Sequence, residues 1–347
     1  MTSGKRIAVD AMGGDFAPRT VVDGAVLAAR RLDTGITLVG DRAALEQELE
    51  RHLDRAALDL TIVDTPERVG MDESPALALR RKPRASVKVA ADLVASGDAA
   101  ALFSAGHTGA TVMASHAAFG MLPGIDRPAL AATLPANGTS RATTPDNARA
   151  VVLLDSGANV ECRPQHLVQF AMMGAAFARA ALDVVEPRVA LLSIGEEAGK
   201  GNELTREAHR LLLTAPVTFV GNIEAGELYS GSADVVVCDG FTGNIALKVS
   251  EGLVETVEAM LREELSQTLG ARLGWLLSRR AFRNFRRRVD YAEYGGAPLL
   301  GVAGITVVGH GRSSAKAVRS AILMAARLAG AGFIEKLKVE ASARQAS

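Results

Sequence analysis

The sequence contains little cysteine and no long apolar run. Only Cys162 and Cys238 occur among 347 residues, and both stand in apolar surroundings, which excludes a disulfide framework and indicates a reducing cytoplasm. No apolar stretch reaches the about 18 residues of a membrane-spanning helix, and MTSGKR leads directly into a strand-like segment without a signal sequence. We therefore expect a soluble protein, or one attached at most to a membrane surface.

Net charge and aromatic residues are also scarce. Lys plus Arg and Asp plus Glu number 39 each, so nothing in the overall charge indicates a nucleic-acid partner. Aromatic residues make up 4% of the chain and hydrophobic residues 48%, which favours tightly packed α/β layers over a β-sandwich. There is no Cys/His metal cluster and no G-x-G-x-x-G spacing, so we expect no metal and no cofactor. The lack of a G-x-S-x-G elbow argues against a Ser–His–Asp set.

The central motif joins a buried strand to a helix through two glycines. The strand Val235–Cys238 is followed by Asp239-Gly240-Phe241-Thr242-Gly243-Asn244, after which apolar residues recur with helical spacing. A glycine turn at a helix N-terminus presents N–H groups and a positive dipole end, which suits an anion. A tight connection that binds nothing has the same pattern.

Four further turns of small residues follow predicted strands. They are Gly13-Gly14-Asp15, Ser104–Gly109, Asp155–Asn159 and Gly195–Asn202. Because ligands collect outside the carboxyl ends of strands in open α/β sheets, we expect all five turns to lie at one edge and to share one cleft.

Lys200 stands between glycines and can meet a phosphate, although the loop is not a Walker A sequence. His107 is either a base or phosphate ligand, or an ordinary loop histidine.

Strands and helices alternate along the chain, which predicts parallel βαβ units. We expect one α/β domain over residues 1–338, with a turn-rich return at Tyr294–Gly301 and a polar tail over 339–347. No nearby histidine activates either thiol, so both cysteines are interpreted as structural.

A basic, amphipathic segment interrupts this alternation within an insertion at about 262–292. Its apolar side carries Trp275, Leu276, Phe282 and Phe285, and its basic side carries Arg279, Arg280, Arg283 and Arg286. Such a helix can lie on a membrane surface, pack in a dimer or dock an acidic protein. The run Arg80-Arg81-Lys82 is a second candidate docking surface, or a solvated helix face.

Ten motifs follow one another along nearly the whole chain. They are DAMGGDFAP, MDESPALALRRK, SAGHTGA, DRPALA, LDSGANVECRPQHLVQFA, GKGNELT, GNIE, ADVVVCDGFTGN, YGGAPLLGV and HGRSSAKA. In these motifs the sequence resembles the bacterial phosphate acyltransferase family of phospholipid synthesis. The resemblance implies an open α/β/α sandwich similar to isocitrate and isopropylmalate dehydrogenases, with a protruding amphipathic helical segment. It also implies a cytoplasmic homodimer, attached peripherally to the inner face of the cell membrane.

The reaction implied by the resemblance transfers a long-chain acyl group from acyl carrier protein to inorganic phosphate. The acyl phosphate then serves the membrane glycerol-3-phosphate acyltransferase, a further partner. Phosphate is its own nucleophile, so no acyl-enzyme is needed. By resemblance, Lys200 binds phosphate and the developing charge, and Asn244 donates to the thioester oxygen.

The remaining candidate residues surround these two. Candidate phosphate- and substrate-binding residues are Gly13, Gly14, Gly106, His107, Gly201, Asn202, Asp239, Gly240, Thr242 and Gly243. Asp239 or His107 is assigned to orient phosphate or take a proton, and His107 stands where the family more often has asparagine.

Three alternatives stay open. A short-chain phosphate acetyltransferase using coenzyme A shares the chemistry, but has less reason for the amphipathic segment. A nicotinamide-dependent decarboxylating dehydrogenase shares the expected fold, but needs a cluster of metal-binding aspartates that the sequence lacks. A membrane scaffold without activity would bind lipid and would not depend on Lys200.

Overall fold

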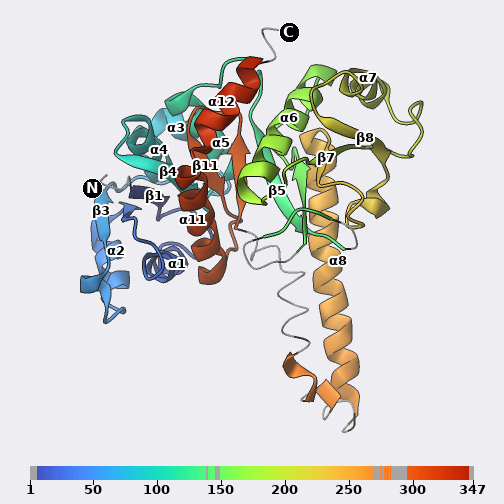
Figure 1. The fold of residues 1–347 in the computed structure, drawn as a ribbon. Helices are drawn as coiled ribbons and strands as arrows, with labels where there is room; N and C mark the ends of the chain where they lie inside the picture. Colours follow the sequence, from blue (N-terminus) through green and yellow to red (C-terminus); the bar gives the residue numbers. More distant parts are fainter. Residues whose placement is uncertain are drawn as a thin grey trace.

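A mixed sheet of eleven strands runs through the part of the chain that the structure describes (Figure 1), in the order β3-β2-β1-β4-β11-β10-β5-β6-β9-β7-β8. The computed structural model describes residues 6–137, 140–144, 149–268, 270, 274–275, 277–280, 282 and 295–343. The strands are β1 (Arg6–Asp10), β2 (Ile36–Gly40), β3 (Leu60–Asp64), β4 (Ala99–Ser104), β5 (Ala129–Pro135), β6 (Ala150–Leu154), β7 (Arg188–Leu192), β8 (Thr218–Ile223), β9 (Val235–Val237), β10 (Ala297–Leu300) and β11 (Ile305–Val308). The predicted α/β fold with a large central sheet is confirmed.

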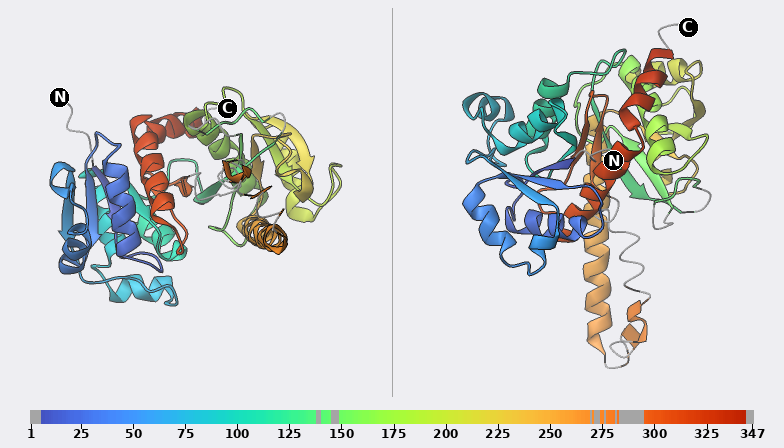
Figure 2. Two further views of the ribbon diagram at one scale, coloured as in Figure 1. Left: turned by 90° about the horizontal axis from the view of Figure 1, so that it is seen from below. Right: turned by 60° about the vertical axis from the view of Figure 1, so that its left-hand side comes forward.

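Helices cover both faces of this sheet. They are α1 (Arg19–Ala29), α2 (Arg42–Leu49), α3 (Pro75–Arg81), α4 (Ser86–Ala95), α5 (Thr108–Phe119), α6 (Pro164–Ala181), α7 (Glu203–Leu212), α8 (Gly240–Gln267), α11 (Ala315–Gly330) and α12 (Phe333–Ala343), with short 3-10 turns at Arg55–Ala57 and Ala225–Glu227. One apolar core lies under α1, α6 and α11, and smaller cores lie under α4 and α5 and beside α8. Figure 2 shows α11 between the N-terminal elements and the elements of the middle of the chain.

Strand direction reverses in the middle of the sheet. The strands β1, β2, β3, β4 and β11 are parallel to one another, and β6, β7, β8 and β9 form a second parallel set. Between the two sets, β10 pairs antiparallel with both β11 and β5, and β5 pairs antiparallel with β6. The carboxyl ends of the two parallel sets therefore lie at opposite edges of the sheet.

Strand β10 was not predicted from the sequence, where Tyr294–Gly301 indicated only a turn-rich return. Ala297–Leu300 is four residues long and contains Pro298, and proline is uncommon inside sheets because it donates no hydrogen bond. Glycines at 295 and 296 both have positive φ, so a turn precedes the strand directly. Because β10 was not predicted, the reversal of strand direction in the sheet was not predicted either.

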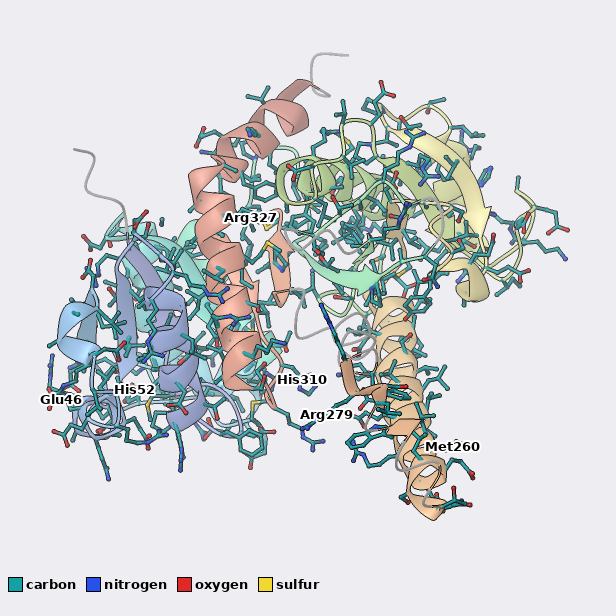
Figure 3. All side chains as sticks on the ribbon, turned by 60° about the horizontal axis from the view of Figure 1, so that its bottom comes forward. Glu46, His52, Met260, Arg279, His310 and Arg327 are labelled. Carbon is teal, nitrogen blue, oxygen red and sulfur yellow. The ribbon has the colours of Figure 1, made fainter. Side chains whose placement is uncertain are left out.

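Helix α8 leaves the body of the protein. It is 28 residues long, and its C-terminal part projects beyond the sheet, where Figure 3 labels Met260. The helix begins at Gly240, well before the insertion predicted at about 262–292. At the other end of the chain, α12 continues to Ala343, so the first residues of the predicted tail are helical.

No single helix among the described residues is long and apolar enough to cross a membrane, although α11 and the first part of α12 pass that test together as a bent pair.

Candidate active site

The five predicted turns form two groups, and the turn after β11, which was not among the five, belongs to the second group. The turns after β6, β7 and β9, here called the lysine cluster, comprise residues 155–162, 193–204 and 239–244. The turns after β1, β4 and β11, here called the glycine cluster, comprise residues 13–16, 104–109 and 309–314. The prediction that all five turns share one edge of the sheet is wrong, because β10 and β5 reverse the strand direction between the two groups.

Lys200 stands at a tight turn in the lysine cluster. Its backbone N–H donates to the Glu197 carbonyl at 2.9 Å, and its side chain is exposed. A Cβ at Gly195 would lie 2.9 Å from Lys200 Cγ, so the absence of a side chain at Gly195 gives the lysine stem its space. The aliphatic part of the Lys200 side chain therefore packs beside Gly195, and the side chain as a whole is exposed to solvent.

The two residues after Lys200 begin helix α7. Gly201 has φ +95°, and a Cβ there would overlap the Thr205 hydroxyl, so the position requires glycine. Asn202 is the N-cap, since its Oδ1 accepts from Thr205 N–H at 2.9 Å. The capping bond uses only Oδ1, so the Nδ2 of Asn202 is the group that can donate to a ligand.

Asp239 caps α8 in the same manner. Its Oδ1 accepts from Thr242 N–H and its Oδ2 from the Thr242 hydroxyl, each at 2.8 Å. Gly240 N–H donates to the Asn159 carbonyl at 2.8 Å, and Gly243 N–H donates to the Asp239 carbonyl at 2.9 Å. Three N–H groups predicted to bind an anion thus have partners within the fold.

The glycines of this turn are required by close packing. A Cβ at Gly240 would stand 2.5 Å from the Asn159 carbonyl oxygen, and a Cβ at Gly243 would overlap the Asp155 carbonyl oxygen. Helix α8 therefore begins in contact with the backbone that follows β6. The asparagine predicted to be catalytic, Asn244, is exposed in this first turn and lies against Gly157, whose φ is +140°.

Asp155 organises the turn after β6 and received no role from the sequence. Its Oδ1 accepts from the N–H groups of Leu130, Gly157 and Ala158 at 2.9–3.1 Å. Its Oδ2 accepts from the backbone N–H and the side-chain Nδ2 of Asn159 at 2.7 and 2.8 Å. Burial raises the pKa of this carboxyl despite these donors. The sequence showed an acidic residue at the end of a strand, but it did not show the five N–H groups that donate to this residue.

An open hollow of about 540 Å³ lies among the turns of the lysine cluster. Its lining residues are Val160, Glu161, Cys162, Asn202, Leu204, Asp239, Phe241 and Thr242. Burial, with the Asp155 and Asp239 charges, raises the pKa of the Cys162 thiol to about 12. Cys238 is buried, and burial raises its pKa as well. Neither thiol is a thiolate near neutral pH, which agrees with their interpretation as structural.

The glycine cluster rests on a buried carboxyl. Asp10 accepts from the Ser104 hydroxyl at 2.7 Å, and Ser104 Oγ accepts from Gly106 N–H at 3.1 Å. A Cβ at Gly13 would lie 2.7 Å from Gly106 N, so these two turns touch through their backbones. Burial raises the pKa of Asp10.

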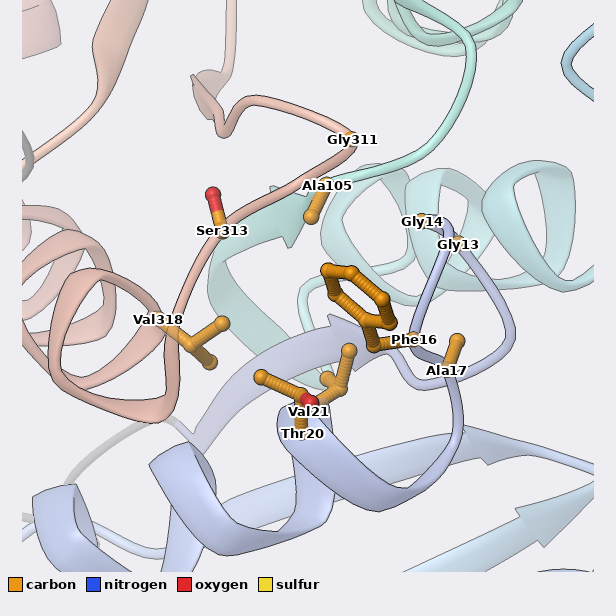
Figure 4. Close-up of a pocket in the computed structure, with 10 residues that line it drawn as sticks. All are labelled: Gly13, Gly14, Phe16, Ala17, Thr20, Val21, Ala105, Gly311, Ser313 and Val318. Carbon is orange, nitrogen blue, oxygen red and sulfur yellow. The ribbon is translucent and has the colours of Figure 1, made fainter. Parts of the chain in front are cut away.

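His107 and Gly14 complete this second group. His107 caps α5, because its Nδ1 accepts from Gly109 N–H at 3.1 Å. Gly14 has φ +111° and lines a small apolar pocket in which the Phe16 ring stands among the lining side chains (Figure 4). The structure thus places Gly13, Gly14, Gly106 and His107 apart from the turns that hold Lys200 and Asn244.

A polar contact links helix α8, which begins in the lysine cluster, to the glycine cluster. Lys248, two turns into α8, has its Nζ 3.1 Å from His310 Nε2 and 2.7 Å from Glu251 Oε2. His310 belongs to the turn after β11 and is labelled in Figure 3. Burial and the Lys248 charge lower its pKa.

The predicted membrane or partner segment is described in part. Trp275, Arg279 and Arg280 are exposed, and Phe282 is half-buried. Leu276, Phe285, Arg283 and Arg286 lie outside the described residues.

The chain matches a family model described as a fatty acid synthesis protein over residues 5–336. A phosphate acyltransferase from Geobacter sulfurreducens is 49% identical over 332 residues, covering 96% of this chain and 93% of the relative. One from Nitratidesulfovibrio vulgaris is 50% identical over 331 residues, covering 95% and 91%.

The chain belongs to the phosphate acyltransferase family. It is accordingly an acyltransferase of fatty-acid and phospholipid synthesis, and phosphate is its substrate.

Solved structures of lower identity share the fold of this phosphate acyltransferase. A phosphotransacetylase from Staphylococcus aureus has a TM-score of 0.59 at 17% identity and covers 94% of this chain and 95% of its own. A 4-hydroxythreonine-4-phosphate dehydrogenase from Klebsiella pneumoniae has a TM-score of 0.53 at 16% identity and covers 94% and 100%. At this level of identity the likeness establishes the open α/β fold alone.

Proposed function

We propose that the protein transfers a long-chain acyl group from acyl carrier protein to inorganic phosphate at the lysine cluster. The observation that carries this proposal is the position of Lys200 and Asn244, which follow the adjacent parallel strands β7 and β9 at the same edge of the sheet. Asn202, two residues after Lys200, lines the same hollow as Asp239 and Thr242. Lys200 and Asn244 are not lining residues themselves, but each is exposed and stands two residues along the chain from one, Asn202 and Thr242 respectively.

The chemistry needs two kinds of support. Lys200 holds phosphate as a point charge, so that a phosphate oxygen can attack the thioester carbonyl carbon. The Asn244 amide donates to the carbonyl oxygen as it becomes an oxyanion. The C–S bond then breaks, the carrier thiolate leaves and takes a proton from solvent, and acyl phosphate is released.

Direct attack by phosphate fits the state of the thiols. Cys162 lines the hollow, but a thiol with a pKa of about 12 is almost entirely protonated at neutral pH and is a poor nucleophile. Phosphate carries its own negative charge and needs no activating base. We therefore assign no acyl-enzyme intermediate to this reaction.

Acyl carrier protein is acidic and needs a basic docking surface. Arg80 and Arg81 are exposed in the last turn of α3, whereas the Lys82 ammonium is paired with Glu73 at 2.6 Å. Arg279 and Arg280 form the described part of the second basic surface. Both remain candidate docking surfaces.

The exposed side of α8 supports assembly into a homodimer. Six apolar side chains at spacings of three or four residues are 45–64% exposed along it, and this apolar stripe consists of Phe241, Ile245, Val249, Leu253, Val257 and Met260. A stripe of this length on a projecting helix buries well against the same stripe of a second copy.

A membrane surface is the other proposed partner. Trp275 and Leu277 expose apolar surface next to Arg279 and Arg280, a combination suited to an anionic lipid surface. This supports peripheral attachment to the inner face of the cell membrane, where the membrane glycerol-3-phosphate acyltransferase would receive the product.

Phosphate-dependent release of carrier protein from palmitoyl-acyl carrier protein tests the proposal. We expect turnover by the wild type, and at least about a hundredfold less by Lys200→Ala and by Asn244→Ala, because each removes an interaction with the transition state. Both side chains are exposed, so circular dichroism should show folded variants. Activity with acetyl-coenzyme A alone would indicate the short-chain enzyme, and liposome binding without turnover would indicate a scaffold.

A further inference from the structure

The motif Gly221-Asn222-Ile223-Glu224 at the end of β8 has no part in the reaction described so far. Asn222 is only 5% exposed, although an asparagine side chain needs several hydrogen-bond partners when buried. It faces the neighbouring strand β7, with Leu191 as its register partner. The hydrogen-bond partners of its amide group therefore explain why an asparagine is buried at this position.

The Asn222 amide connects helix α7 to the turn that carries Lys200. Its Nδ2 donates to the Glu197 carbonyl at 3.1 Å. That same carbonyl accepts the backbone N–H of Lys200 at 2.9 Å. On its other side, Asn222 Oδ1 lies 2.8 Å from His209 Nδ1 on α7.

His209 fixes which way the amide points. The Oδ1 contact is a hydrogen bond when His209 carries its proton on Nδ1, and the reversed amide would place two oxygens together at the Glu197 carbonyl. The imidazole is held in turn by an edge-to-face contact with Phe219, with ring centroids 5.1 Å apart. The Phe219 ring thus restrains the His209 ring, and His209 restrains the orientation of the Asn222 amide.

We propose that Asn222 is a positioning residue for Lys200, and that His209 orients it. The inference rests on the proposed role of Lys200 in binding phosphate. Asn222 holds the Glu197 carbonyl, Glu197 closes the turn at Lys200, and the gap at Gly195 directs the lysine stem. A lysine has many rotamers, so a fixed backbone turn reduces the entropy lost when its ammonium meets phosphate.

Two variants remove this support without adding charge. Asn222→Leu keeps the side-chain volume and removes the amide. His209→Phe keeps an aromatic ring against Phe219 and removes only the N–H that orients Asn222. We expect Asn222→Leu to lower kcat/KM for phosphate by about five- to tenfold, the value of one hydrogen bond, and His209→Phe to lower it less.

Lys200→Ala provides the control that separates positioning from general stability. In that background, Asn222→Leu should lower the remaining activity by less than about twofold, because there is no longer a lysine to position. A full five- to tenfold loss in both backgrounds would overturn the proposal.

Trypsin supplies a readout that does not depend on activity. It cleaves after Lys200, and a loosened turn is cut faster. We expect Asn222→Leu to speed this cut at least about fivefold relative to the cut after Arg81 on α3, as followed by mass spectrometry. An unchanged rate would overturn the positioning role. If the wild type shows no phosphate-dependent turnover while the cut is faster, the proposed function fails and the structural link stands.

Discussion

Substituting Gly243 in the first turn of α8 tests the contact on which the lysine cluster depends. An added Cβ would overlap the Asp155 carbonyl oxygen and lie 2.9 Å from Cys238 Sγ. A carbonyl oxygen in a hydrogen-bonded backbone cannot rotate away as a flexible side chain can. We therefore expect Gly243→Ala to shift the start of α8 and to move Asn244 with it.

Gly252 in the same helix provides a matched control. Nothing lies within 4 Å of a Cβ built there, so Gly252→Ala should stabilise the protein by about 1 kcal/mol through helix propensity alone. Gly243→Ala gains the same propensity but incurs overpacking of roughly 1–3 kcal/mol. The difference between the two variants cancels the shared gain and leaves the steric cost, which we place at about 3 kcal/mol because the obstacle is backbone.

Urea unfolding followed by circular dichroism, at one fixed protein concentration, measures this difference. The activity of Gly243→Ala should also fall at least about tenfold, whereas Gly252→Ala should retain wild-type activity. Equal midpoints and equal activity for the two variants would show that α8 does not begin against the Asp155 turn, and would refute the arrangement of the site.

Two further predictions concern the glycine cluster and the apolar stripe. Burial raises the pKa of Asp10 above 3.8, so the folded state binds its proton more tightly and the free energy of unfolding should fall as pH rises above about 4, until the folded pKa is passed. Asp10→Asn should reduce this slope, and an unchanged slope would contradict it. Val249→Asp should convert a dimer to monomers in sedimentation velocity, while Glu255→Ala, which lies off the stripe, should not. A wild type that sediments as a monomer would exclude the proposed interface.

Much of the fold follows from apolar runs that end at glycine turns. The strands around Ala8, Leu102, Val152 and Val236 are buried on both faces, and such strands appear in a sequence as unbroken apolar segments. The reversal of the sheet could not be predicted in this way. It depends on β10, a four-residue strand containing Pro298 whose pairing with β5 joins residues far apart in the chain.

The sequence predicted which segments form the candidate site, but not what the individual residues contact there. A strand followed by a helix was correctly predicted here, but Gly240 and Gly243 lie in the first turn of α8 and not in a turn before it. From the sequence, the glycines were interpreted as space for an anion, whereas in the structure they make room for the Asp155 and Asn159 backbone. Close packing between turns that are distant in sequence leaves no local pattern, so Asp155 could not be recognised as the acceptor of five N–H bonds.

The roles of polar side chains also depend on hydrogen-bond partners that the sequence alone does not show. Asn202 and Asp239 were proposed as ligands, and both cap helices. A capping residue and an anion ligand have the same residue types, because both place an oxygen or an amide at a helix N-terminus. For Asn222 the sequence showed only a short motif, and the contact with Glu197 required the fold.

The mass of the protein during turnover, together with the identity of the labelled product, tests the central claim most directly. Wild-type protein is incubated with palmitoyl-acyl carrier protein and phosphate labelled with ¹⁸O at every oxygen, and the product and the intact protein are weighed by mass spectrometry. Direct attack predicts acyl phosphate that retains all the labelled oxygens, an unmodified protein mass, and loss of the product with Lys200→Ala. A palmitoyl adduct on Cys162, or the same labelled product from Lys200→Ala at an undiminished rate, would contradict the account.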